Sequence, residues 1–239
     1  MNLLALDTST DIMSVAVQRA SAAGAAGAAP QVWQHSGPGG AQTSAQLIPT
    51  IQRLMAQAGL QFVDLDAIAF GCGPGSFTGL RTACSVAQGL AFGANLKVLP
   101  IDTLLAVAEE ARFQEASTLA RWQVTALLDA RMDEMYAASY VFESGKWRQI
   151  KGCSLIRPED LVMDAASPLA GNVFANYGAR LPVGAPRITA LPTASALLRL
   201  APTLLAEGAA VAADQALPLY IRDKVAQTTL ERATEKAAR

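Results

Sequence analysis

Histidine, cysteine and charged side chains are all scarce in this chain. Of its 239 residues, one is histidine, three are cysteine and 16% are charged. The HExxH and HxxxH metal motifs need two histidines and a Ser-His-Asp triad needs one at a set place, so the lone His35 argues against both. Cys72, Cys84 and Cys153 form no CxxC pair, which argues against a disulfide framework and fits a reducing cytosol. We therefore expect no metal site.

A basic surface and a membrane segment are also lacking. The net charge is −1, whereas a protein that grips nucleic acid by itself needs clustered Lys and Arg. No basic segment precedes an apolar run at the N-terminus, and Asp7 interrupts the first apolar stretch, so a signal peptide is not expected. The charge-free stretch from Thr82 to Leu96 holds glycine and polar residues, so no membrane span is expected. The sequence predicts a cytoplasmic protein with no membrane partner.

Apolar residues are abundant. They make up 51% of the chain, and the mean hydropathy is +0.25. A chain of this length fits one large domain or two small lobes, either of which can bury a core. The excess of apolar residues predicts exposed apolar surface that a partner would cover.

Glycine is concentrated between Phe70 and Arg81, where four glycines fall within nine residues. An apolar run typical of a buried strand precedes this loop, and residues 80–92 have helical spacing. Strand, loop and helix in this order aim backbone N–H groups at one site, with Ser76 or Thr78 as the helix cap. The loop either cradles a phosphate or is a tight turn. It is not a Walker motif, because Leu80 rather than lysine follows Gly79.

Two helices have faces that could meet a partner. In the helix after the loop, small residues recur every fourth position at Gly79, Ala83, Ala87 and Ala91. Such a ridge lets another element approach closely, inside the fold or across a subunit interface. The helix predicted at 44–58 has a broad apolar face, which is either core or half of an interface.

The N-terminus predicts a buried strand, an acidic turn from Asp7 to Thr10, and a second strand that completes a hairpin. An Asp on such a turn can hold Mg²⁺ through water, but the turn can equally satisfy its own backbone, and the residues alone favour the latter. Residues 124–142 repeat the order strand, acidic turn, strand, which suggests an internal duplication with Asp129 in the place of Asp7. Asp129 and Arg131 could also form a structural ion pair.

Several of these stretches resemble the bacterial TsaB (YeaZ) family. The resemblance rests on GCGPGSFTGLRTACSVAQGLAFG at 71–93, on LLALDTST at 3–10, on LDARMDEMY at 128–136 and, more weakly, on PLYIR at 218–222. It implies an α/β fold of two actin-like ATPase (RNase H-like) lobes, each a mixed β-sheet with helices packed on it. We expect the lobes at 1–108 and 109–222, followed by a polar tail at 223–239.

The resemblance also implies a function. The chain would be a non-catalytic partner in the complex that forms N6-threonylcarbamoyladenosine at position 37 of tRNAs reading ANN codons. It would activate a TsaD subunit by forming a heterodimer, a TsaE-like ATPase would dock on the pair, and tRNA would be contacted through the complex. Alone, the chain would form a homodimer. TsaD relatives have a histidine pair on their first long helix, where this chain has Thr43-Ser44-Ala45.

Site residues follow from these expectations. No catalytic residue and no required cofactor are predicted, and ATP or ADP would bind weakly or at the subunit interface. A vestigial nucleotide site would comprise Asp7, Thr8, Gly73, Gly75 and Ser76. The partner interface would comprise Leu47, Ile51, Leu54, Met55, Gly79, Ala83, Ala87 and Leu90.

Two other functions are weighed against the scaffold. An actin-like ATPase or small-molecule kinase would use Asp7, the glycine loop and Asp129, and its ATP hydrolysis would be lost on Asp7→Asn. A peptidase is disfavoured, because the single histidine leaves no organised nucleophile, base and orienting group.

Overall fold

The computed structural model describes residues 1–21, 29–162 and 167–222. Most of the alanine- and glycine-rich run from Ala20 to Pro30 and all of the predicted tail at 223–239 lie outside these ranges. Among the described residues, the structure contains no helix with the length and apolarity that a bilayer crossing requires.

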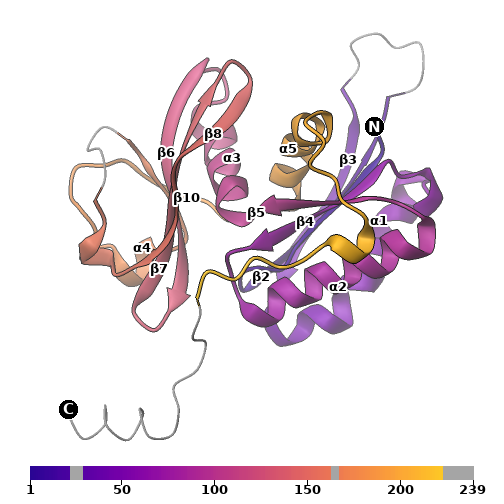
Figure 1. Ribbon diagram of the computed structural model, residues 1–239, viewed down its shortest axis with the longest axis horizontal. Coiled ribbons are helices and arrows are strands. Elements are labelled where there is room, and N and C mark those ends of the chain that lie inside the picture. Colours follow the sequence, from indigo (N-terminus) through magenta and orange to yellow (C-terminus); the bar gives the residue numbers. More distant parts are fainter. Residues whose placement is uncertain (22–28, 163–166, 223–239) are drawn as a thin grey trace, which may run out of the picture.

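The first lobe is built on a five-stranded mixed sheet in the order β3-β2-β1-β4-β5 (Figure 1). Its strands are β1 (Leu3–Asp7), β2 (Ile12–Arg19), β3 (Gln31–Pro38), β4 (Ala67–Gly73) and β5 (Val98–Asp102). β2 is antiparallel to β1 and β3, whereas β1, β4 and β5 are parallel. The predicted strands and the N-terminal hairpin are confirmed.

Helices cover both faces of this sheet, because side chains alternate between the faces along each strand. On one face, Leu4 and Leu6 share a core cluster with α1 (Thr43–Ala58) and α2 (Phe77–Ala94). On the other face, Leu3 and Ala5 share a second cluster with α5 (Ala194–Ala206). α1 ends where Gly59 adopts a left-handed φ of 63°, and α2 begins at Ser76, whose side chain accepts a hydrogen bond from the Gly79 N–H. Of the two candidate caps, Ser76 is thus the one used.

The second lobe repeats the topology of the first. Its strands are β6 (Arg121–Arg131), β7 (Glu134–Glu143), β8 (Lys146–Ile156), β9 (Leu169–Gly171) and β10 (Arg187–Thr189). Their order is β10-β9-β6-β7-β8, with β6 and β7 forming the hairpin that β1 and β2 form in the first lobe. Asp129 pairs with Met135 near the end of β6, and Asp7 pairs with Ser14 at the end of β1. The predicted duplication is confirmed.

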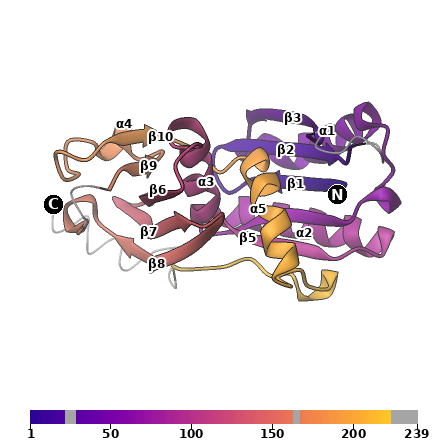
Figure 2. The same cartoon turned by 90° about the horizontal axis from the view of Figure 1, so that it is seen from above.

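α3 (Thr103–Glu115) lies between the lobes and packs on β6 through Leu104, Val107 and Ala111 (Figure 2). α4 is a short helix at Phe174–Tyr177 on the outer side of the second sheet. Short 3-10 helices lie at Gly40–Gln42, Phe62–Asp64, Pro158–Asp160 and Ala213–Gln215.

The predicted lobe boundaries need one correction. α5 lies within the range 109–222 yet packs on the first sheet, where Leu197 and Ala201 are buried against it. Residues 211–222, here called the return segment, then run along α2 toward the second lobe (Figure 1). In this segment the Ala216 carbonyl accepts from Gln88 Nε2 (2.9 Å), and the Leu219 N–H donates to the Cys72 carbonyl (2.7 Å). The first lobe is therefore completed by the C-terminal part of the chain.

Candidate partner-binding face and interlobe cleft

The glycine loop and the Asp7 turn are held together by their backbones. The Ser76 N–H donates to the Ser9 carbonyl at 2.7 Å, and Thr8 Oγ1 donates to the Gly79 carbonyl at 2.6 Å. A Cβ at Gly79 would overlap the Thr8 carbonyl oxygen, and one at Gly75 would lie 2.6 Å from the Ser9 oxygen. These glycines therefore permit two loops to approach closely, which favours the tight-turn interpretation over the phosphate cradle.

Three backbone donors of the glycine loop are used inside the protein. The Gly73 N–H donates to Thr103 Oγ1 at 3.0 Å and the Gly79 N–H donates to Ser76 Oγ. With the Ser76 N–H bonded to Ser9, three donors that a phosphate would need already have partners.

Substituting two glycines of α2 should distinguish a glycine that close packing requires from one that it does not. We expect Gly79→Ala to lower the free energy of unfolding by about 3 kcal/mol, because its methyl group meets a backbone oxygen that cannot rotate away. The matched control is Gly89→Ala, whose added Cβ has nothing within 4 Å and should stabilise the helix by about 0.5–1 kcal/mol. Chemical denaturation of both variants tests this pair, and a loss of stability at Gly89 as large as that at Gly79 would contradict it.

Asp7 is fully buried. Its Oδ1 accepts from the Ser9 N–H (2.9 Å) and from Ser9 Oγ (2.7 Å), whereas Oδ2 has no partner among the described residues and faces the Cα of Gly71. Burial raises the pKa of Asp7 to about 6, an effect that the two Ser9 hydrogen bonds only partly oppose. The turn thus satisfies part of its own backbone, as the residues alone suggested.

A cavity of about 350 Å³ separates the lobes near this turn. It is lined by Ser9 and Ser76 from the first lobe and by Asp129, Arg131 and Arg222 from the second, whereas Asp7 is not part of its wall. The predicted nucleotide residues are thus divided: Ser76 and Gly75 reach the cavity, and Asp7 does not.

The turn that follows Asp129-Ala130-Arg131 spans this cleft with an ion pair. Arg131 Nη2 lies 2.6 Å from Asp11 Oδ2 in the first lobe and Nη1 lies 3.4 Å from Asp129 Oδ2, so the predicted Asp129–Arg131 pair is confirmed. Arg131, Met132 and Asp133 all have φ near +60°, a region that residues other than glycine rarely adopt. Asp129 Oδ1 stabilises the turn by accepting from the Arg131 N–H at 2.8 Å. Asp11 was missed, because nothing local in the sequence pairs it with a residue 120 positions away.

Most of the predicted interface residues face the core instead. The side chains of six of them are at most 3% exposed in the single chain: Leu47, Ile51, Leu54, Met55, Ala83 and Ala87. Gly79 is in contact with the Thr8 carbonyl, and Leu90 is half-buried against the same core cluster. This corrects the predicted side of the helices: the apolar stripes of α1 and α2 pack on the sheet, so a partner that docks on these helices would meet their outward sides.

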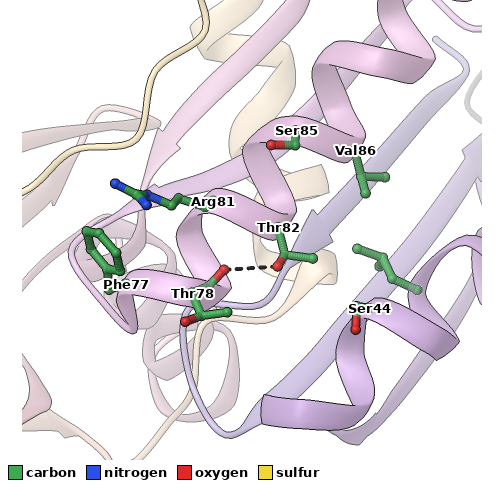
Figure 3. Close-up of a pocket in the computed structure, with 8 residues that line it drawn as sticks. Ser44, Phe77, Thr78, Arg81, Thr82, Ser85 and Val86 are labelled. Carbon is green, nitrogen blue, oxygen red and sulfur yellow. Dashed lines mark hydrogen bonds between the residues drawn. The ribbon is translucent and has the colours of Figure 1, made fainter.

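The outward sides of α1 and α2 are apolar in part and built of small residues. Ile48, Phe77 and Phe92 are exposed, Phe92 by 83%. An exposed line on α2 is formed by Ser85, Gly89 and Gly93. A Cβ added at either glycine would have nothing within 4 Å, so the packing of the single chain does not require glycine there. A pocket of about 430 Å³ lies between the helices, lined by Ser44, Leu47, Phe77, Thr78, Arg81, Thr82, Ser85 and Val86 (Figure 3). We call this surface the α1/α2 face.

The described residues provide no support for a metal-ion site. Among the described residues, no group of three or more His, Cys, Asp and Glu side chains is arranged to hold a metal ion. His35 lies half-buried in the edge strand β3.

Comparisons with known proteins agree with the architecture. The model of the TsaD family, described as tRNA N6-adenosine threonylcarbamoyltransferase, matches residues 31–188. The protein named tRNA threonylcarbamoyladenosine biosynthesis protein TsaB from Escherichia coli (strain K12) is 32% identical over 95% of this chain and 96% of its own length. The protein of the same name from Haemophilus influenzae is 33% identical over 94% of this chain and 95% of its own length.

Solved structures match as well. The structure of YeaZ from Pseudomonas aeruginosa has a TM-score of 0.79 and 36% identity, covering 92% of this chain and 99% of that one. A second structure, described as an uncharacterized protein with similarity to peptidase YEAZ from the same organism, has a TM-score of 0.81 at the same identity and coverage. The predicted α/β fold of two actin-like lobes is confirmed, and the chain belongs to the TsaB (YeaZ) family, within the wider TsaD family whose model it matches.

Proposed function

We propose that this chain takes part in forming N6-threonylcarbamoyladenosine in tRNA, as a subunit that performs no chemistry itself. Two relatives that are 32–33% identical to this chain are named for this pathway, and the matches cover 95–96% of their lengths. The product is the modified adenosine at position 37 of tRNAs that read ANN codons. A cytoplasmic location fits this proposal, because the pathway acts on tRNA.

The observation that supports the proposal most is the α1/α2 face. Its exposed Phe92, Gly89 and Gly93 have no role in the packing of the single chain, and a helix from another subunit could approach closely along them. We propose that a TsaD-like subunit docks there and is held in its active shape. A TsaE-like ATPase would dock on that pair, tRNA would be contacted through the complex, and the free chain would pair with itself through the same face.

The interlobe cleft supports the absence of catalysis. The Asp7 carboxyl points under Gly71 rather than into the cavity, and three of the loop donors are bonded to Ser9, Thr103 and Ser76. We propose that no cofactor is required and that ATP or ADP binds this chain weakly or at the subunit interface. One observation favours the alternative of an ATPase or small-molecule kinase, namely the 350 Å³ cavity beside Ser76.

Reconstitution tests the proposal. The TsaD and TsaE proteins of the same organism are supplied with tRNA and a source of threonylcarbamoyl-adenylate, with and without this chain, and the modified nucleoside is measured by mass spectrometry. We expect modification to fall to background when the chain is left out. Equal modification without it would overturn the proposal. ATP hydrolysis by the isolated chain that is lost on Asp7→Asn would support the kinase or ATPase alternative instead.

A further inference from the structure

The two helices that form the α1/α2 face contain arginine but no Asp or Glu. Over α1 and α2 the charged residues are Arg53 and Arg81, and both are exposed. The pocket between the helices is lined by hydroxyl groups and aliphatic side chains, with Arg81 as its one charged lining residue. The surface is therefore matched to a partner that supplies negative charge.

Arg81 is held in place by aromatic side chains. Its Nε donates to the hydroxyl of Tyr220 in the return segment at 2.8 Å, and its Cζ lies 3.8 Å from the centroid of the Phe77 ring. The Phe77 and Tyr220 rings pack on each other with centroids 5.3 Å apart. Figure 3 shows Arg81 extending beside Phe77 at one end of the pocket. The two terminal nitrogens of Arg81 have no hydrogen-bond partner within the described part of the chain, so four N–H donors remain for a ligand.

A second copy of the chain satisfies these donors poorly. In a two-fold pair each copy presents the same surface to the other, so the acid that meets Arg81 would have to lie on this same face. Neither α1 nor α2 contains Asp or Glu, and Asp214 of the return segment lies beyond Ala216, whose carbonyl bonds Gln88. Gln88 is about two helical turns from Arg81, or roughly 10 Å along α2. Self-pairing thus brings the apolar surfaces together but offers no carboxylate at the pocket.

We propose that Arg81, oriented by Phe77 and Tyr220, selects a different protein over a second copy of this chain by binding a carboxylate on the partner. The fitting partner is a helix with an Asp or Glu beside a small or aliphatic residue that enters the pocket. A guanidinium whose Nε is already bonded offers its two parallel terminal N–H groups to both oxygens of one carboxylate. This inference rests on the proposed function, in which the partner is a TsaD-like subunit.

The test measures two affinities for each variant. Heterodimer formation with the TsaD subunit is followed by calorimetry at 50 mM and 500 mM salt, and self-association by sedimentation, for the wild type and Arg81→Gln. We expect Arg81→Gln to weaken the heterodimer about tenfold at low salt, to remove most of its salt dependence, and to change self-association by less than about twofold. Arg81→Lys retains the charge without the paired donors and should lie between.

The matched control is Arg53→Gln. Arg53 is an exposed arginine about half a turn around α1 from Ser44, so it lies away from the pocket and its loss should change neither affinity. An unchanged heterodimer in Arg81→Gln, or an equal loss in Arg53→Gln, would overturn the inference. So would weaker self-association in Asp214→Asn, because self-pairing would then supply the carboxylate. Tryptophan at Ser85 tests the docking face separately, so the two proposals can fail independently.

Discussion

Tryptophan in place of Ser85 should weaken binding to the TsaD-like subunit at least about hundredfold and leave the free chain folded. Ser85 is exposed on α2 and lines the pocket between α1 and α2. An indole there fills the pocket and holds the incoming helix away, so the contacts at the centre of the interface are lost together. Calorimetry with the partner subunit measures the affinity, and the unfolding temperature of the free variant should stay within about 2 °C of the wild type.

Two other positions sharpen this experiment. Gln114→Trp places the same side chain on an exposed site of α3, away from the face, and should leave binding unchanged. Ala87, two residues beyond Ser85, is fully buried, so Ala87→Trp would disrupt the core and is unsuitable as a probe of the interface. Full affinity in the Ser85→Trp variant would exclude this part of α2 from the docking surface.

The prediction of the interface shows where sequence reasoning stops. The period of Leu47, Ile51 and Leu54 correctly identifies a helix and its apolar side. It does not say what that side packs against, because burial in a core and burial in an interface select the same residues. The informative residues are the ones that the packing of the single chain leaves unexplained, such as Gly89 and Phe92. They can be identified only when the packing of α1 and α2 on the first sheet is known.

Long-range pairs are the other part that the sequence conceals. Local patterns suffice for the two hairpins, for the strand before the glycine loop and for the equivalence of Asp7 and Asp129. The ion pair from Asp11 to Arg131 and the one from Glu134 to Arg222 join residues about 90–120 positions apart, which no spacing rule connects. The same limit explains why α5 was assigned to the wrong lobe: its apolar face fits either sheet, and the topology decides.

Replacing Glu109 should produce the largest loss of stability. The Glu109 side chain is 3% exposed on α3 and accepts four hydrogen bonds. Three of 2.9 Å come from Arg112 Nε, from Arg199 Nε in α5 and from Trp147 Nε1 in β8, and one of 3.2 Å comes from Arg112 Nη2. Glu109→Ala leaves the partly buried Arg112 guanidinium without an acid beside Arg199, which retains only its pair with Glu110 (2.6 Å), and we expect a loss of about 3–5 kcal/mol. The unfolding temperature should fall by roughly 6–20 °C.

The matched control is an exposed ion pair that links β8 to the end of α5. Lys146 in the β7–β8 hairpin and Glu207 after α5 form an ion pair of 2.8 Å whose side chains are about half exposed. Glu207→Ala should therefore change stability by less than about 1 kcal/mol. Equal effects of the two substitutions would mean that burial contributes nothing at Glu109. If Glu109→Ala fails to fold, Glu109→Gln retains one acceptor and should show an intermediate loss.

The Glu109 variants also test whether the elements on one face of the first sheet can be destabilised without affecting those on the other face. Glu109 joins α3 and α5 to the second lobe, whereas α1 and α2 rest on the opposite face of the first sheet over a separate core cluster. Weakening the Glu109 cluster should therefore increase hydrogen exchange in α5 and β8 together, and leave α1 and α2 protected. In Glu109→Gln we expect the affinity for the partner to stay within about twofold of the wild type. A large loss of affinity would show instead that the packing between the lobes affects the docking face. The return segment would then connect the two, because Tyr220 contacts Arg81 and Arg222 pairs with Glu134.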